Sequence, residues 1–356
     1  MSATTLTRSQ LASRHRADAL DARIEQDPAA FRMLSGDRPT GALHVGHYFG
    51  SLHNRVRLQD AGIDLFVVIA DYQAMTDRVV PPDLPDLVAG LVADYLAIGI
   101  DPRRSTIFAH SQIAALNQLL LPFLGLVSVA EIGRNPTVKD EISAAGLATV
   151  SGLMFTYPVH QAADILFCHA NLVPVGLDQL PHLEITRTVA RRFNERYSPG
   201  RPYFREPEAL LSAAPLLLGT DGQKMSKSRN NSLPLRASAD ETARLLGKAK
   251  TDAEKVISFE PQRRPEVANL LSLTALCRGS TPEEVADEIG NRGAAALKAA
   301  AIDAVNERFA EVRARRAELA ADPGYLRTVL AAGNERATAI ADDTLRAVRE
   351  LMNQRY

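Results

Sequence analysis

The sequence predicts an α/β protein, in which a Rossmann-like parallel sheet with flanking helices is followed by an α-helical C-terminal domain. The run DLFVVIAD, residues 64–71, is continuously apolar and rich in β-branched side chains, which is typical of a strand buried on both faces. Strand-like and helix-like segments alternate before residue 200, as they do in parallel α/β sheets. After residue 232 the pattern is helical to the end, rich in Ala, Arg, Glu and Leu.

Length and composition narrow the class of protein further. A chain of 356 residues is long enough for two domains, and 46% apolar with 23% charged residues is typical of a globular protein. The net charge of -1 provides no overall basic field, so any nucleic acid would be bound by a local patch. Only Cys168 and Cys277 are present, which disfavours a disulfide scaffold or a zinc knuckle. Without a membrane-spanning run or a secretory signal, we expect a cytoplasmic protein with no membrane partner.

The chain begins with a polar, Ala-rich extension, residues 1–30, which we expect to be helical or partly ordered. A strand, a Gly/Pro loop and a helix then begin at Phe31 and open a domain that extends to residue 235. The remaining predicted elements of this domain are a helix over 84–98, a strand over 105–111 and helices over 114–132, 151–155 and 179–197. Residues 236–356 form the helical domain.

A glycine-rich segment, PTGALHVGHYFGSL, follows the first predicted strand. It places Gly41 in a turn and His44, Gly46 and His47 at the start of a helix. Glycine there allows a purine or a phosphate to approach the backbone, and the amides of the first helical turn attract anions. The two histidines share one helix face, where both can donate to phosphate oxygens. The alternatives are a helix end with surface histidines or, less favoured because no third ligand is near in sequence, a metal site.

A polar loop, TDGQKMSKSRNN, lies near the end of the same domain. It carries Lys224 and Lys227 with Ser226 and Ser228, so it can close over a triphosphate and stabilise the charge that moves to a leaving pyrophosphate. The alternative is an exposed, solvated loop.

Together these two segments resemble the signature motifs of class I aminoacyl-tRNA synthetases, and KMSKS matches that family at all five positions. The resemblance implies attack of an amino-acid carboxylate on the α-phosphorus of ATP, then transfer of the aminoacyl group to tRNA. No protein nucleophile is needed, because positioning and charge stabilisation carry such chemistry. His44, His47, Lys224, Lys227 and Lys139 would be the catalytic residues.

The segment from Thr156 to Tyr197 is similar to the tryptophanyl-tRNA synthetase family, through YP…AADIL, VPVG-DQ and A-RFN. The resemblance implies that Asp164 accepts the indole N–H of tryptophan and that Tyr157 and Gln179 hold its amino end, with Gln73 and Gln161 at two further pocket positions. A buried carboxylate left unpaired would reject phenylalanine. The implied ATP-binding residues are Arg38, Pro39, Thr40, Gly46, His47, Gly176, Leu177, Asp178, Leu217, Lys224, Met225, Ser226, Lys227 and Ser228.

Some positions depart from the tryptophanyl pattern and leave alternatives open. Tyr157, Gln161 and Asp164 form Y-x-x-x-Q-x-x-D, which is similar to the tyrosine-binding signature of the sister tyrosyl family. VPVGLDQ lacks the glycine pair that tyrosyl enzymes commonly carry before DQ, which favours tryptophan. The alternatives are therefore a tyrosine–tRNA ligase and a non-catalytic tryptophan-sensing paralogue. The departures, which include Leu34 and Val138, indicate a divergent branch that would bind tryptophan mimics differently.

The resemblance also implies the partners. The helical domain would read the anticodon of tRNA(Trp), a homodimer would form through an insertion at about 112–170, and Mg2+ would accompany ATP without a dedicated metal site in the protein. Arginines on two predicted helices suit phosphate groups, although pairing with nearby glutamates accounts for them as well. These arginines are Arg187, Arg191, Arg192, Arg308, Arg313, Arg315 and Arg316.

Overall fold

The computed structural model describes residues 19–76, 81–135, 150–176, 180–211, 216–226 and 229–356. Its centre is a five-stranded sheet with the order β3-β2-β1-β4-β5. All of its strand pairs are parallel. The strands are β1 (Arg32–Asp37), β2 (Asp64–Ile69), β3 (Ser105–Ala109), β4 (Leu172–Val175) and β5 (Glu208–Leu211). β2 and β3 are added on one side of β1, and β4 and β5 on the other. The strand order therefore reverses between β1 and β4, and parallel α/β proteins bind ligands at such a topological switch point.

Alternate residues of the central strands pack on the two faces of this sheet. Met33, Leu65 and Val67 belong to one buried cluster, whereas Leu34 and Phe66 belong to the other. This alternation follows from the two-residue period of a strand, and burial on both faces explains the continuous apolar run of β2. Both predicted strands in this region are confirmed, although each ends two residues earlier than expected.

Helices cover the sheet: α2 (Val45–His47), the π-helical η2 (Tyr48–Leu52), α3 (His53–Ala61), α4 (Leu84–Ala97), α5 (Ala114–Leu124), α6 (Val129–Arg134), α8 (Gly152–Leu166) and α9 (Leu180–Tyr197). Two short 3-10 turns, η3 (Tyr72–Met75) and η4 (His110–Gln112), follow β2 and β3. The single helix predicted over 114–132 is wrong. It divides into α5 and α6, because Ser128 and Glu131 form a reciprocal capping box that starts a new helix.

The helix predicted over 151–155 is also wrong in length, since α8 continues to Leu166. Ser151 caps its first turn by accepting a hydrogen bond from the Met154 amide. Pro158 lies inside the helix, where its missing N–H removes one hydrogen bond of the helical ladder.

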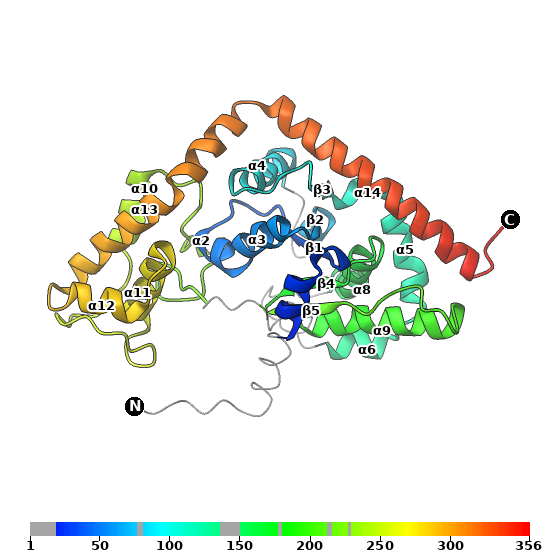
Figure 1. Ribbon diagram of the computed structural model, residues 1–356, viewed down its shortest axis with the longest axis horizontal. Helices are drawn as coiled ribbons and strands as arrows, with labels where there is room; N and C mark the ends of the chain where they lie inside the picture. Colours follow the sequence, from blue (N-terminus) through cyan, green and yellow to red (C-terminus); the bar gives the residue numbers. More distant parts are fainter. Residues whose placement is uncertain (1–18, 77–80, 136–149, 177–179, 212–215, 227–228) are drawn as a thin grey trace.

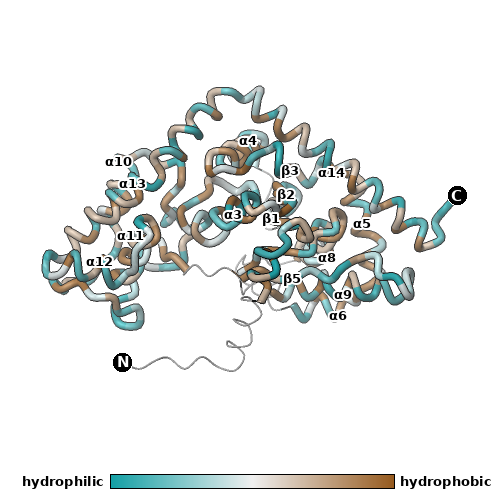
Figure 2. Tube along the Cα trace, viewed as in Figure 1, coloured by the Kyte–Doolittle hydropathy of each residue, from teal (hydrophilic) through white to brown (hydrophobic). Residues whose placement is uncertain are grey.

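The C-terminal part is helical, as predicted, with α10 (Ala239–Gly247), α11 (Pro265–Arg278), α12 (Pro282–Ile289), α13 (Gly293–Ala320) and α14 (Pro323–Leu351). Figure 1 shows α13 and α14 meeting in an inverted V above the sheet, with α14 passing over β3 and α5. Along both helices hydrophilic and hydrophobic residues alternate (Figure 2), as expected when one side packs and the other faces solvent. None of the helices in the described ranges is long and apolar enough to cross a membrane.

The last helix closes the outer edge of the sheet. A Cβ added at Gly333 of α14 would lie 1.8 Å from the backbone oxygen of Ile107 in β3, so only glycine permits this approach. Beside it, the Ala109 amide donates to Oδ1 of Asn334 at 2.8 Å. α14 therefore covers the edge of β3 and provides a hydrogen-bond acceptor for one of the backbone amides that β3 would otherwise leave unpaired.

Part of the N-terminal extension also packs on the molecule. Residues 19–26 are helical, and Leu20 and Ile24 are buried in the same apolar cluster as Met33. The described end of the extension is thus anchored by two apolar side chains on one helical face.

Candidate active site

The two signature segments lie side by side beyond the carboxyl end of β1. The Val45 amide donates to the carbonyl of Leu233 at 3.0 Å, and the Leu235 amide donates to that of Leu43 at 2.9 Å. A Cβ added at Gly46 would lie 3.4 Å from Sδ of Met225. Residues about 180 positions apart therefore form one wall at the switch point of the sheet, as the pairing of the two motifs predicts.

The two histidines of the first segment cap α2. The His47 amide donates to Nδ1 of His44 at 3.3 Å, and the His44 amide donates to Nδ1 of His47 at 3.2 Å. The two rings are 3.6 Å apart. Since each Nδ1 accepts a hydrogen bond, each neutral ring carries its proton on Nε2, the atom that it can direct to a phosphate. His44 is 6% exposed, so it is not a surface histidine.

The loop before α2 has the expected turn. Gly41 adopts a φ of 134°, which favours glycine, and the Thr40 amide donates to the carbonyl of Arg38 at 2.8 Å. Arg38 is exposed and Pro39 is buried, so the loop presents a cation next to the opening of α2.

Beneath this loop lies a buried charged cluster. Asp37, the last residue of β1, accepts hydrogen bonds from Nη1 of Arg55 at 2.7 Å and from the Tyr95 hydroxyl at 2.8 Å. Burial alone would raise the pKa of Asp37, but the Arg55 guanidinium outweighs it and holds the pKa well below its usual range, with a smaller contribution from His47. The cluster ties α3 and α4 to the strand end that carries the first motif.

The second segment is organised by a side chain that the sequence did not single out, Asn231. It is 2% exposed, and its Oδ1 accepts from the Ser226 amide at 2.8 Å. Its Nδ2 donates to Asp221 at 2.8 Å and to the carbonyl of Lys224 at 3.1 Å. Lys224 itself is exposed. Asn231 thus holds the first half of the lysine loop in shape while the lysine head faces outward.

Two of the residues proposed for the amino acid, Gln73 and Asp164, lie next to each other near the C-terminal end of α8. Asp164 is 2% exposed, and Nε2 of Gln73 lies 3.5 Å from its Oδ2. Burial and the charge of Asp71 raise the pKa of Asp164 well above its usual value. Tyr157 lies about two turns before Asp164 on the same face of α8. It is also buried, and its hydroxyl lies 2.7 Å from Nε2 of His182. Gln161 is half-buried on the same helix.

The structure describes some of the other predicted site residues and leaves six of them outside its described ranges. Gly176 is exposed directly after β4, and Leu217 is buried before the lysine loop. Lys139, Leu177, Asp178, Gln179, Lys227 and Ser228 lie outside the described residues.

Comparison with known proteins bears on this arrangement. Residues 26–310 match the model of the family described as tRNA synthetases class I (W and Y). A tryptophan–tRNA ligase of Streptococcus pneumoniae is 38% identical over 336 residues, which cover 91% of this chain and 98% of that protein. One from Treponema pallidum is 40% identical, covering 90% and 96%. The chain belongs to the class I tryptophanyl-tRNA synthetases.

Solved structures of this family have the same fold. The tryptophanyl-tRNA synthetase of Campylobacter jejuni, in complex with ADP and tryptophan, superposes with a TM-score of 0.79 at 29% identity, covering 90% of this chain and 99% of that one. The tyrosyl-tRNA synthetase of Archaeoglobus fulgidus, 21% identical, shares the fold with a TM-score of 0.65. The fold class and the family expected from the two motifs are confirmed.

Within this synthetase, the arginines considered for phosphate binding have protein partners. The pairs are Arg187 with Glu184, Arg191 with Glu206, Arg192 with Glu131, Arg308 with Tyr48, Arg313 with Thr242, Arg315 with Glu311, and Arg316 with Asp94. Three of these bonds join α13 to the first domain or to α10 (Arg308, Arg313 and Arg316). Of these seven, Arg187 and Arg315 pair with a glutamate of their own helix, which was the alternative to phosphate binding, whereas the other five bond to residues outside their own helix.

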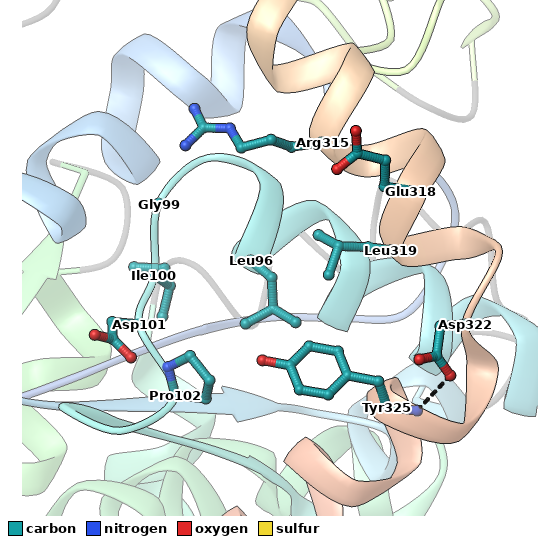
Figure 3. Close-up of a pocket in the computed structure, with 10 residues that line it drawn as sticks. All are labelled: Leu96, Gly99, Ile100, Asp101, Pro102, Arg315, Glu318, Leu319, Asp322 and Tyr325. Carbon is teal, nitrogen blue, oxygen red and sulfur yellow. Dashed lines mark hydrogen bonds between the residues drawn. The ribbon is translucent and has the colours of Figure 1, made fainter.

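A cavity of about 510 Å3 lies elsewhere on the synthetase, where the end of α4 meets the bend between α13 and α14. Its floor is formed by Leu96, Ile100, Pro102 and Leu319, and the ring of Tyr325 projects across it (Figure 3). Arg315 lines it, but none of the predicted catalytic, ATP-binding or amino-acid-binding residues that the structure describes does, so this cavity is separate from the described part of the active site.

Proposed function

We propose that this synthetase activates L-tryptophan with ATP to tryptophanyl-adenylate and transfers the tryptophanyl group to tRNA(Trp). The family is that of tryptophan–tRNA ligases, and a member of it binds ADP and tryptophan together. The observations that support the proposal are the contact of Gln73 with the buried Asp164 and the backbone hydrogen bonds that join the segments carrying the two nucleotide motifs.

The tryptophan end of the site is a buried carboxylate. Asp164 lies on α8, is 2% exposed, and has Nε2 of Gln73 at 3.5 Å from its Oδ2. A buried carboxylate needs a donor, and the indole N–H of tryptophan supplies one, whereas the ring of phenylalanine cannot. Tyr157 and, by resemblance, Gln179 would hold the substrate's amino group, which leaves its carboxylate directed to ATP.

The nucleotide end would bind ATP against the opening of α2. The amides there and the Nε2–H groups of His44 and His47 would donate to phosphate oxygens. Lys224, on the loop packed against Gly46, would stabilise negative charge on the leaving pyrophosphate together with Lys227. ATP would enter as its Mg2+ complex, with the ion bound mainly by phosphates and water, because Mg2+ seldom uses an all-protein cage.

The remaining partners follow from the family. The helical residues 236–356 would bind the tRNA, and two copies of the chain would form a dimer through the region of α5, α6 and α8. Leu121 and Val129 in this region are 70% and 74% exposed, which is unusual for large apolar side chains and suits a surface that a second copy covers.

The test is amino-acid-dependent ATP–pyrophosphate exchange with tryptophan, tyrosine and phenylalanine in turn, on the wild type and on Asp164→Asn. We expect exchange with tryptophan only. In Asp164→Asn, kcat/KM for tryptophan should fall about 10- to 100-fold, because a charge-assisted hydrogen bond contributes about 1.5–3 kcal/mol. The matched control is Asp303→Asn, an exposed change on α13 that should leave exchange unaltered.

Exchange with tyrosine in place of tryptophan would instead make Tyr157, Gln161 and Asp164 a phenol site. Absence of exchange with all three amino acids would favour a non-catalytic paralogue. Equal activity of Asp164→Asn and wild type would remove Asp164 from indole recognition while leaving the ligase assignment in place.

A further inference from the structure

Four polar side chains from three elements meet behind the tryptophan pocket. They are His110 of η4, Asn117 of α5, and His160 and Asp164 of α8. The two histidines and the aspartate are at most 3% exposed. Nε2 of His160 lies 2.8 Å from Oδ1 of Asn117 and 2.7 Å from Nε2 of His110. Nε2 of His110 lies 3.1 Å from Oδ1 of Asp164.

Hydrogen bonds alone do not satisfy this chain of atoms. Nδ2 of Asn117 donates to the carbonyls of His110 and Ile113, so its Oδ1 must be an acceptor. If the single Nε2 proton of neutral His160 goes to Asn117, the contact between the two Nε2 atoms has no donor–acceptor pair. If it goes to His110 instead, Nε2 of His110 has no proton for Asp164. In the described structure Oδ1 of Asp164 has no hydrogen-bond partner, although it is buried.

We propose that this cluster is a site for a divalent transition-metal ion of the Zn2+ class, with His110 Nε2, His160 Nε2 and Asp164 Oδ1 as ligands and Asn117 Oδ1 as the nearest candidate for a fourth. These ligand atoms of the two histidines and the aspartate lie within 4.8 Å of one another. A cation removes the conflict, because all of these atoms then act as electron-pair donors. Two imidazoles with one carboxylate favour Zn2+, Co2+ or Ni2+ over Mg2+ or Ca2+.

The geometry of α8 supports metal binding. His160 and Asp164 are four residues apart on α8, so they project from one face of the helix toward His110.

The site has a consequence for tryptophan that rests on the proposed function. An ion bound to Oδ1 of Asp164 leaves Oδ2, the oxygen next to Gln73, to accept the indole N–H. The ion would compensate the charge of the buried carboxylate and fix its orientation, so metal and tryptophan should each strengthen the binding of the other. The two ions of the reaction would then differ in kind: Mg2+ would come with ATP, and the transition metal would stay with the protein.

The affinity should be moderate. Metal-bound histidines usually donate their second N–H to an acceptor, and loss of such a contact weakens binding about 10- to 100-fold. Within the described residues Nδ1 of His110 and Nδ1 of His160 have no hydrogen-bond partner. We therefore expect an ion that exchanges and that chelators remove without unfolding the protein.

The experiment is titration of chelator-treated, full-length protein with Co2+, followed by its visible d–d absorption. We expect bands that saturate at one ion per chain and that Zn2+ displaces. His160→Leu and His110→Gln should each weaken Co2+ binding at least about 100-fold, since a ligand is lost outright. His53→Leu, which removes a histidine of α3 outside the cluster, should bind as the wild type does. Thermal unfolding of each variant verifies that it is folded.

A wild type without saturable bands, or with bands that persist in folded His160→Leu and His110→Gln, would overturn the site. Tryptophan-dependent exchange on the same samples tests the coupling: restoring the metal should lower KM for tryptophan about 10-fold with little change in kcat. An unchanged KM would overturn the coupling alone. Saturable bands with no tryptophan exchange would support the metal site and contradict the proposed function.

Discussion

The first domain should be sensitive to loss of the charge of Asp37. Its carboxylate lies at the end of β1 between Arg55 and Tyr95, and the side chain of Arg55 is only 3% exposed. A buried ion pair of this kind adds little to the free energy of unfolding when compared with two well-packed apolar residues in its place. Removing only one partner is costly, however, because the other charge then stays buried without compensation. The local pattern of the sequence shows none of this, because Asp37 and Tyr95 are 58 residues apart.

Asp37→Asn should therefore decrease the free energy of unfolding by about 3–5 kcal/mol, measured by urea denaturation at pH 7. The matched control is Asp60→Asn. Asp60 pairs with Arg104 on the surface, with side chains 60% and 45% exposed, so this change should cost less than about 1 kcal/mol. Equal losses for the two variants would show that the Asp37 pair is solvated.

The same pair gives a pH dependence with a definite sign. The pKa of Asp37 is lower in the folded state than in the unfolded state, where it is about 3.9. The ionised Asp37 therefore contributes fully to the free energy of unfolding above about pH 3.9, and this contribution is lost as the pH falls toward the folded-state pKa. Wild-type stability should decrease more steeply below pH 4 than that of Asp37→Asn. Parallel curves from about pH 5 to about pH 2.5 would contradict this.

At the level of single residues, the sequence predicted Gln73 and Asp164 as pocket positions, and the structure brings them together. It did not indicate His110, Asn117, His182 or Asn231. His110, Asn117 and His182 make contacts with positions far away in the chain, such as His110 with His160, and periodicity or motif spacing carries no information about such pairs. Asn231 bonds to residues five to ten positions away, but within an irregular loop that has no periodic pattern. The one local signal was the four-residue spacing of His160 and Asp164.

The lysine loop is the element whose shape matters most for the proposed chemistry. Lys224 is exposed, so its position depends on the backbone that Asn231 holds from within. Asn231 also accepts from the Ser226 amide, and a Cβ at Gly219 would lie 2.4 Å from its side chain. The loop is therefore built around this amide rather than around its lysines.

Asn231→Ala should lower kcat of ATP–pyrophosphate exchange about 10- to 100-fold, because small displacements of positioned groups cost this much, while KM for tryptophan stays nearly constant. Asn306→Ala is the control, since Asn306 bonds only to Arg313 and the Ala239 carbonyl, within the helical part that the structure describes. A rise in the KM for tryptophan with unchanged kcat would indicate that Asn231 acts on the amino-acid pocket instead.

For helices and strands, the sequence predicted the kind of element better than the residues at which each element begins and ends. The run 64–71 identified β2 because a short, continuous, β-branched apolar run is typical of a strand covered on both faces. β4 and β5 were not identified, since each has only four residues. Pro174 is uncommon in an inner strand such as β4, and Glu208 has a low propensity for strands such as β5. α5 and α6 were merged because the apolar pattern continues through Leu126 and Val127, and only the capping box at Ser128 marks the break.

At the scale of the molecule, α14 joins the helical part to the sheet. It approaches β3 at Gly333, and Thr344 donates to the carbonyl of Phe167 in the first domain. These contacts span more than 170 residues of sequence. The division into an α/β domain and a helical domain was predictable from the change of pattern after residue 232. The return of the last helix to the sheet was not, because it depends on surface complementarity that no local pattern encodes.

The apolar surface of α5 and α6 leads to a prediction for the assembly. Leu121 and Val129 belong to the segment 112–170, and exposure of 70% and 74% is costly in water unless a second copy covers them. Leu121→Asp would place a charge in such an interface and leave it desolvated without a partner. We expect the wild type to sediment as a dimer in analytical ultracentrifugation and Leu121→Asp to sediment as a monomer at the same concentration.

The control separates an interface from general solubility. Val256→Asp introduces the same charge at a valine that is 61% exposed but lies between α10 and α11, away from α5 and α6. It should remain dimeric. If both variants dissociate, charge rather than position is responsible. If Leu121→Asp stays dimeric, the copies associate through another surface, because an unpaired carboxylate buried at an interface should cost several kcal/mol of association free energy.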